Sequence, residues 1–117
     1  MIRFLDGPAV GVVLSLRRAP LFLRVVEENG KFDALDQLTD EPKASEKIHV
    51  YRRHGPASGA FVCSRGKNRH LSGFQAIAEY RHFPVEESTL ESIRSTSGWR
   101  AWATLAHESE KASDPKS

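Results

Sequence analysis

Residues 48–53, IHVYRR, decide the fold, and residues 77–82, IAEYRH, repeat their pattern. Each stretch begins with a β-branched residue and ends in Tyr-Arg followed by a base, a composition typical of strands. Two further segments echo each other, GPAVG at residues 7–11 and GPASG at residues 55–59, and both are typical of turns. Strand-like runs separated by Gly-Pro turns predict a mostly β protein.

Length and composition set the class of protein. The 117 residues suffice for one domain, and 39% hydrophobic with 27% charged residues fits a folded domain. The single cysteine, Cys63, cannot form an intramolecular disulfide, which favours a reducing cytoplasm. Residues 6–8 (DGP) interrupt any signal-peptide core, and no apolar run approaches the roughly 20 residues of a membrane helix. We therefore expect a cytoplasmic protein that does not act on membranes.

Charge is distributed in blocks along the chain. Residues 49–82 carry six basic residues and one acid, together with four of the five histidines. Residues 27–48 carry seven acids and three lysines. Such blocks can form a positive face and a negative face that attract a partner or a second copy of the chain.

Three strands are expected in the N-terminal part, at residues 1–5, 11–16 and 21–26. Asn29-Gly30 is the pair favoured in type I′ hairpin turns, so a further strand is expected to run back through Phe32. The polar residues 33–47 predict a long exposed loop, or one short helical turn at residues 34–38.

The middle of the chain predicts an antiparallel meander. Its strands are expected at residues 48–53, 60–64 and 74–83, separated by a turn at residues 55–59 and a polar loop at residues 65–73. Tyr51 and Tyr80 would then lie side by side on neighbouring strands.

A helical segment is expected after Pro84 ends the β region. Ser88 and Glu91 match a capping box, which marks a helix start. After an interruption at Gly98, one apolar face follows at helical spacing: Trp99, Trp102, Ala103 and Ala106. Residues 108–117 are polar and predict a disordered tail.

Together these elements predict a mostly β, α+β fold in one domain of residues 1–107. We expect a small antiparallel sheet, rolled into a barrel or arranged as a sandwich. A C-terminal helical segment, at about residues 86–107, is expected to pack on one open face of that sheet.

The basic middle block contains the strongest candidate for a binding surface. Its cations could neutralise phosphates, and its tyrosines could stack on bases if they are exposed. The candidate residues are Arg52, Arg53, Arg65, Lys67, Arg69, Tyr51 and Tyr80. A solvated hairpin loop accounts for the same charges, because charge alone indicates only non-specific affinity.

The sequence lacks a recognisable catalytic constellation. Residues 66–68 read Gly-Lys-Asn where a P-loop needs Ser or Thr after the lysine, and Phe61 stands at the place of its first glycine. The acids of residues 33–46 lack EF-hand spacing. Cys63 follows the apolar pair Phe61-Val62, and one cysteine with scattered histidines does not indicate a zinc site. We therefore predict no catalytic, cofactor-binding or metal-binding residues.

Trp99 and Trp102 allow two interpretations. On an amphipathic helix they could bind a partner's groove or form a subunit interface. They could also cover the β core, as large aromatic side chains do in small domains. We favour the core, and the two roles are compatible in a dimer.

Residues 6–11, DGPAVG, are followed by an apolar strand, a proline, and Tyr-Arg pairs at residues 51–52 and 80–81. This order resembles a group of short uncharacterised phage and bacterial proteins that carry a GGP-x-DG turn near the start and Tyr-Arg later. The chain departs from that pattern at Asp6 and Val10. The resemblance implies a strand-and-turn organisation and no activity.

We therefore expect a non-enzymatic binding protein whose partner is another protein or a second copy of the chain. The charge blocks and the aromatic C-terminal segment favour this expectation. Nucleic acid binding through the basic residues 52–70 is the alternative.

Overall fold

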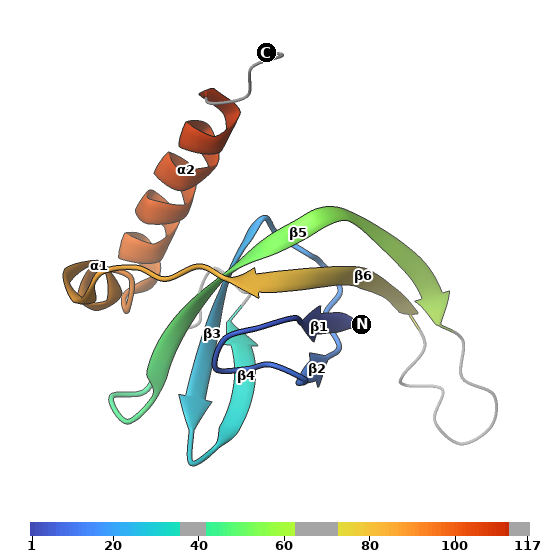
Figure 1. The fold of residues 1–117 in the computed structure, drawn as a ribbon, viewed down its shortest axis with the longest axis horizontal. Helices are drawn as coiled ribbons and strands as arrows, with labels where there is room; N and C mark the ends of the chain where they lie inside the picture. The colour runs from blue at the N-terminus through green and yellow to red at the C-terminus, as the bar shows by residue number, and fades with distance from the viewer. Residues whose placement is uncertain (36–41, 63–72, 113–117) are drawn as a thin grey trace.

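The computed structural model describes residues 1–35, 42–62 and 73–112. Within them, six strands form one sheet that curls into a nearly closed barrel (Figure 1). The strands are β1 (Ile2–Phe4), β2 (Val13–Leu14), β3 (Phe22–Glu28), β4 (Lys31–Leu35), β5 (Lys47–Val62) and β6 (Gly73–His82). The prediction of a small, mostly β domain is confirmed, and its form is the rolled barrel.

The strand order is β2-β1-β6-β5-β3-β4. Neighbouring strands are antiparallel except for β1 and β6, which run parallel. This pair differs from the purely antiparallel sheet that the sequence predicts. β1 and β6 are the first and last strands along the chain and are not joined by a hairpin, so no turn constrains them to opposite directions.

β5 is one long, bent strand where the sequence predicts two strands and a turn. It continues through residues 55–59, with Gly55 at φ 79° and a shift in the β5–β6 register between His54 and Ser58. Glycine is typical of β-bulges as well as of turns. A β-bulge, however, bends the strand without reversing its direction. The predicted turn at residues 55–59 is therefore wrong, and β5 and β6 form one long antiparallel hairpin (Figure 1). Residues 63–72, most of the predicted polar loop, lie outside the described residues.

The Asn-Gly turn between β3 and β4 forms as predicted. Asn29 (φ 53°) and Gly30 (φ 77°) both have positive φ, as a type I′ turn requires. β4 then continues to Leu35 because it pairs with β3. The helical turn predicted at residues 34–38 is therefore wrong at residues 34 and 35, and its remaining residues are outside the described part of the chain.

The inside of the barrel is an apolar core that contains two tyrosines. Its buried members are Ile2, Phe4, Ala9, Leu23, Val25, Tyr51, Ala76, Ala78 and Tyr80. The Tyr51 hydroxyl donates to the Asp6 carbonyl (2.9 Å) and accepts from the Ala9 amide (2.8 Å). The Tyr80 hydroxyl donates to the Pro20 carbonyl. Both tyrosines thus hold N-terminal loops against the barrel.

Two helices follow the sheet, α1 (Glu87–Ser92) and α2 (Thr96–Ala112). The predicted capping box is wrong, because α1 starts at Glu87 and places Ser88 inside its first turn. The N-cap residue is Glu86, which makes no side-chain capping hydrogen bond. Val85 packs against the helical core just before the cap, so the chain turns into the helix earlier than the motif indicates.

The second helix is longer than predicted. It continues to Ala112, whereas the sequence predicts a disordered tail from residue 108. Glu110 explains the difference, since its two carboxylate oxygens accept hydrogen bonds from Arg52 Nε and Nη2, each 2.8 Å long. That hydrogen bond also lowers the pKa of Glu110. The last turn of α2 is therefore held against β5.

The helices cover the outer face of β3 and β5 and bury a second apolar core. Trp99 and Trp102 stack with ring centroids 5.4 Å apart, and Trp102 meets Phe22 edge-on at 5.2 Å. The other buried members are Val26, Ile48, Val50 and Ile93. The prediction that the tryptophans cover the β core is confirmed.

Arg24 lies in the middle of this second core and is fully buried. Its Nη1 donates to the carbonyl oxygens of Ile93 (2.7 Å), Arg94 (3.2 Å) and Ser95 (3.4 Å). The guanidinium carbon also lies 5.6 Å from the centre of the Trp99 ring. These carbonyls belong to the corner between α1 and α2. The Ser95 carbonyl also accepts from the Trp99 amide (2.9 Å), so the guanidinium is the donor mainly for the Ile93 and Arg94 carbonyls, of which the Ile93 bond is buried.

The start of α2 packs closely against the end of α1. The Ser95 hydroxyl accepts from the Gly98 amide (3.0 Å) and acts as the N-cap of α2. A Cβ on Gly98 would lie 1.9 Å from the carbonyl oxygen of Ser92. The interruption at Gly98 noted in the sequence is therefore a close approach of two backbones.

We predict that Arg24→Met lowers the free energy of unfolding by about 3 kcal/mol, because the Ile93 and Arg94 carbonyls lose their charged donor while the side-chain volume stays similar. Urea denaturation measures the change. Arg100→Met, at an exposed position of α2, is the matched control and should change stability by less than about 0.5 kcal/mol. Equal stability of the two variants would contradict the role given to Arg24.

We predict that Gly98→Ala destabilises the protein by about 1–3 kcal/mol through overpacking against the Ser92 carbonyl. Helix propensity alone favours alanine by about 1 kcal/mol, so the two effects have opposite signs. Thermal and urea denaturation decide between them, with the exposed Ser109→Ala as control. A stabilised Gly98→Ala would show that the two backbones are not in close contact.

Candidate functional site

The two tyrosines proposed for base stacking are not on the surface. Tyr51 and Tyr80 are both 0% exposed and belong to the barrel core. Burial also raises the pKa of the Tyr51 hydroxyl. The prediction of Tyr51 and Tyr80 as surface residues is therefore wrong, because strand alternation directs both side chains into the barrel.

The predicted basic residues do not form one free cationic surface in the described part of the chain. Arg52 is bonded to Glu110 across to α2. Arg53 Nη1 donates to the Ala19 carbonyl (2.6 Å) and its Nε to the Gly55 carbonyl (3.2 Å). The other three candidates, Arg65, Lys67 and Arg69, lie outside the described residues. Arg52 and Arg53 are thus structural ties between segments.

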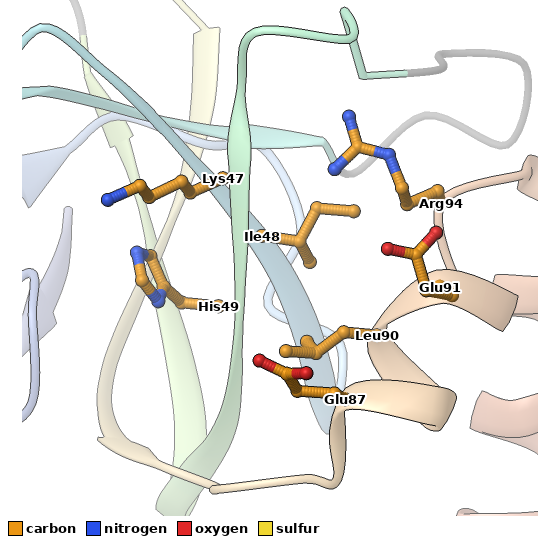
Figure 2. A pocket seen from close by; sticks show the side chains of 7 residues that line it. All are labelled: Lys47, Ile48, His49, Glu87, Leu90, Glu91 and Arg94. Carbon is orange, nitrogen blue, oxygen red and sulfur yellow. The ribbon is translucent and has the colours of Figure 1, made fainter.

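A hollow of about 370 Å³ lies between the start of β5 and α1 (Figure 2). It is lined by Lys47, Ile48, His49, Glu87, Leu90, Glu91 and Arg94. Ile48 and Leu90 point into the space between the strand and the helix, whereas the side chains of Lys47 and His49 point to the other face of β5 (Figure 2). The hollow therefore has an apolar floor and a charged rim, as ligand sites commonly do.

The strand wall of this hollow is a sheet edge. β6 pairs with β5 from Tyr51 onward, and the last contact of that ladder is the Phe83 amide donating to the Val50 carbonyl (2.8 Å). Pro84 follows, has no amide hydrogen, and ends the ladder as the chain leaves toward α1. From Lys47 to His49, β5 pairs with β3 on one side and with no described strand on the other. We call this second side of residues 47–49 the open edge.

The backbone of Ile48 faces this open edge. In an antiparallel pair, successive residues direct their amide and carbonyl groups to alternate sides. The Val50 carbonyl is directed toward β6, since it accepts from Phe83, and Ile48 is two residues away. The amide and carbonyl of Ile48 therefore point toward the hollow, ready to pair with an added strand.

A second hollow, of about 580 Å³, lies on the other side of Lys47. Its lining residues are Glu27, Glu28, Asn29, Gly30, Ser45 and Lys47. Among the described residues its lining has no apolar side chain, and it shares only Lys47 with the open edge, so the hollow beside α1 is the better candidate site.

Titratable groups gather at one end of the barrel interior. His49 Nε2 lies 2.9 Å from Glu27 Oε1, and the rings of His49 and His82 are 6.4 Å apart. The His82 amide donates to Asp6 Oδ1 (2.6 Å), and Gly7 packs directly on the His82 side chain. Burial lowers the pKa of His82, His49 lowers it further, and Asp6 opposes both. Gly7 has φ 72°, and a Cβ there would lie 2.5 Å from His82 Cβ, so only glycine fits this contact.

Two further observations concern only the described residues. No group of three or more His, Cys, Asp or Glu side chains among them could hold a metal ion. No helix among them is long and apolar enough to cross a membrane.

Sequence reasoning missed Glu87, Leu90 and Glu91 as site residues. Pro84 was available as a signal, because a proline directly after a strand ends its hydrogen-bond ladder and leaves the neighbouring edge open. The position of α1 beside that edge depends on tertiary packing and has no local signature.

Comparison with known proteins gave no match to a family model, a curated protein or a solved structure. The resemblance to short phage and bacterial proteins therefore stays a prediction.

We predict that stability falls as the pH drops from about 6.5 through the lowered pKa of His82. Above that range the histidine is neutral in both states, within it the unfolded chain binds the proton more readily than the folded one, and below it both states are protonated. His82→Gln should reduce the loss of unfolding free energy between about pH 7.5 and pH 5, measured by urea denaturation. His54→Gln, at an exposed position, should keep the wild-type slope. An unchanged slope in His82→Gln would contradict the assignment.

Proposed function

We propose that this protein is a non-enzymatic binding protein that takes up an extended segment of a partner protein beside the open edge of β5. The observation that carries this proposal is the open edge itself: β6 leaves β5 at Pro84, and a hollow of about 370 Å³ lies where a further strand would pair. Addition of a strand to an exposed sheet edge is a common mode of peptide recognition.

The geometry supports a short, specific site. Backbone groups of Ile48 offer one donor and one acceptor to an added strand, which provides affinity independent of sequence. Ile48 (6% exposed) and Leu90 belong to one packed cluster, and its outer surface gives an apolar floor on which a partner's side chain can lie. Such a site suits a segment of a few residues that is extended when bound. We also propose a cytoplasmic location, which fits the single cysteine.

Nucleic acid binding has less support than protein binding. Of its seven candidate residues, two are buried and two are bonded to other segments, as described above. The remaining Arg65, Lys67 and Arg69 provide charge in the sequence alone.

Selection from a displayed library of random linear peptides of about eight residues, with the full chain as bait, tests the proposal. Fluorescence polarisation then gives the affinity of a selected peptide, and hydrogen exchange gives its position. We expect micromolar binding and at least about tenfold slower exchange of the Ile48 amide in the complex. No enriched peptide, or protection of the β4 edge at Lys31–Leu35 instead, would overturn the proposal.

We predict that Leu90→Trp weakens binding of the selected peptide by at least about tenfold, because the indole occupies the hollow. Leu105→Trp is the matched control, since Leu105 is 67% exposed on α2, and it should leave the affinity unchanged. Circular dichroism establishes that both variants are folded. Equal affinities of two folded variants would exclude this hollow as the site.

A further inference from the structure

Two carboxylates border the hollow on its helical side. Glu87 and Glu91 lie four residues apart on α1, so they share one face of the helix. Both are exposed, and neither forms an ion pair within the part of the chain that the structure describes. Leu90 lies between them and faces Ile48 across the hollow (Figure 2).

We infer that the bound segment carries a lysine or arginine opposite Ile48, with its aliphatic stem across Ile48 and Leu90 and its charge beside Glu87 and Glu91. This inference rests on the proposed function. Directly opposed residues of paired strands project to the same face of the sheet, and Ile48 projects toward the helices. The partner's side chain at that position therefore meets α1.

The chemistry of the hollow matches a long basic side chain better than an apolar or acidic one. Lysine and arginine lay their methylene groups on apolar surface and keep the charge at the edge, which is the order of groups found here. An acidic side chain would meet two like charges, which opposes binding.

One cation on the helical side, Arg94, also lines the hollow and offsets part of the charge of this pair. The guanidinium of Arg94 donates to the carbonyls of Glu46 (3.0 Å) and Lys43 (2.7 Å), and it is held against the segment before β5. The side chains of Lys47 and His49 lie on the opposite face of the strand (Figure 2). On the helical side two carboxylates, Glu87 and Glu91, thus stand against one guanidinium, and they are the countercharges for an incoming cation beside Leu90.

The test uses the peptides selected on the full chain. Their sequences are compared first, and a double-mutant cycle then measures the binding affinities of peptide and protein variants. We expect enrichment of lysine or arginine at one position. Replacing that residue by norleucine should lower the affinity for the wild-type protein about fivefold. The same replacement should lower the affinity for the Glu87→Gln/Glu91→Gln variant by less than about twofold. Glu108→Gln, at an exposed position of α2, is the charge control and should retain the full fivefold effect.

Two outcomes would overturn the inference and leave the proposed function standing. One is peptide binding with protection of the Ile48 amide but without an enriched basic position. The other is an equal loss on norleucine substitution in the wild type and in the Glu87→Gln/Glu91→Gln variant. Failure to select any peptide that protects Ile48 would instead overturn the proposed function itself.

Discussion

The contact of the buried Arg24 guanidinium with the Ile93, Arg94 and Ser95 carbonyls is the constraint on which the rest of the structure depends. A cation inside an apolar core is costly unless polar partners surround it, and here the partners include the Ile93 and Arg94 carbonyls after the end of α1, which themselves need donors. The carbonyls offset the cost of burying the guanidinium charge, and the guanidinium supplies the donor that the carbonyls would otherwise lack. Because Arg24 belongs to β3 and the carbonyls to the corner after α1, this contact fixes the helices relative to the sheet.

The position of α1 follows from that corner and determines the candidate site. Gly98 allows the first turn of α2 to approach the Ser92 carbonyl, and Ser95 caps α2 at the same point. Three residues therefore suffice to join the two helices at a sharp corner, and α1 lies beside the start of β5. Pro84 has already ended the β6 ladder there, so the helix forms a wall facing an unpaired strand edge.

Much of the fold could be predicted from local signals. Alternating apolar residues identify the strands, Asn29-Gly30 identifies a turn that needs two positive φ values, and the spacing of Trp99 and Trp102 identifies a helical face. The features of the fold that the sequence did not predict depend on contacts between residues that are far apart in the sequence. A glycine-rich bulge at residues 55–59 has the composition of a turn, and only pairing with β6 distinguishes them.

The burial of Tyr51 and Tyr80 could not be predicted from the sequence for a different reason. Near residues 48–52, both faces of β5 are buried, one by the barrel core and the other by the helices. Alternation indicates which residues share a face, but it cannot say which face is exposed when neither is. Nothing in the run LFLRVV at residues 21–26 indicates that its arginine is a buried donor to a helix corner.

Burial of both faces also limits what β5 can offer to a partner. The side chains that a half-exposed strand would present, such as Tyr51 and Val50, are committed to the two cores. Residues 47–49 can therefore contact a partner mainly through their backbone groups at the open edge. Selectivity for the partner's sequence must then come from the opposite wall of the hollow. That wall is α1, whose leucine and two glutamates differ in chemistry from the strand they face. A site with strand-edge hydrogen bonds on one side and a short amphipathic helix on the other is suited to an extended chain with a long side chain, and much less to a compact ligand.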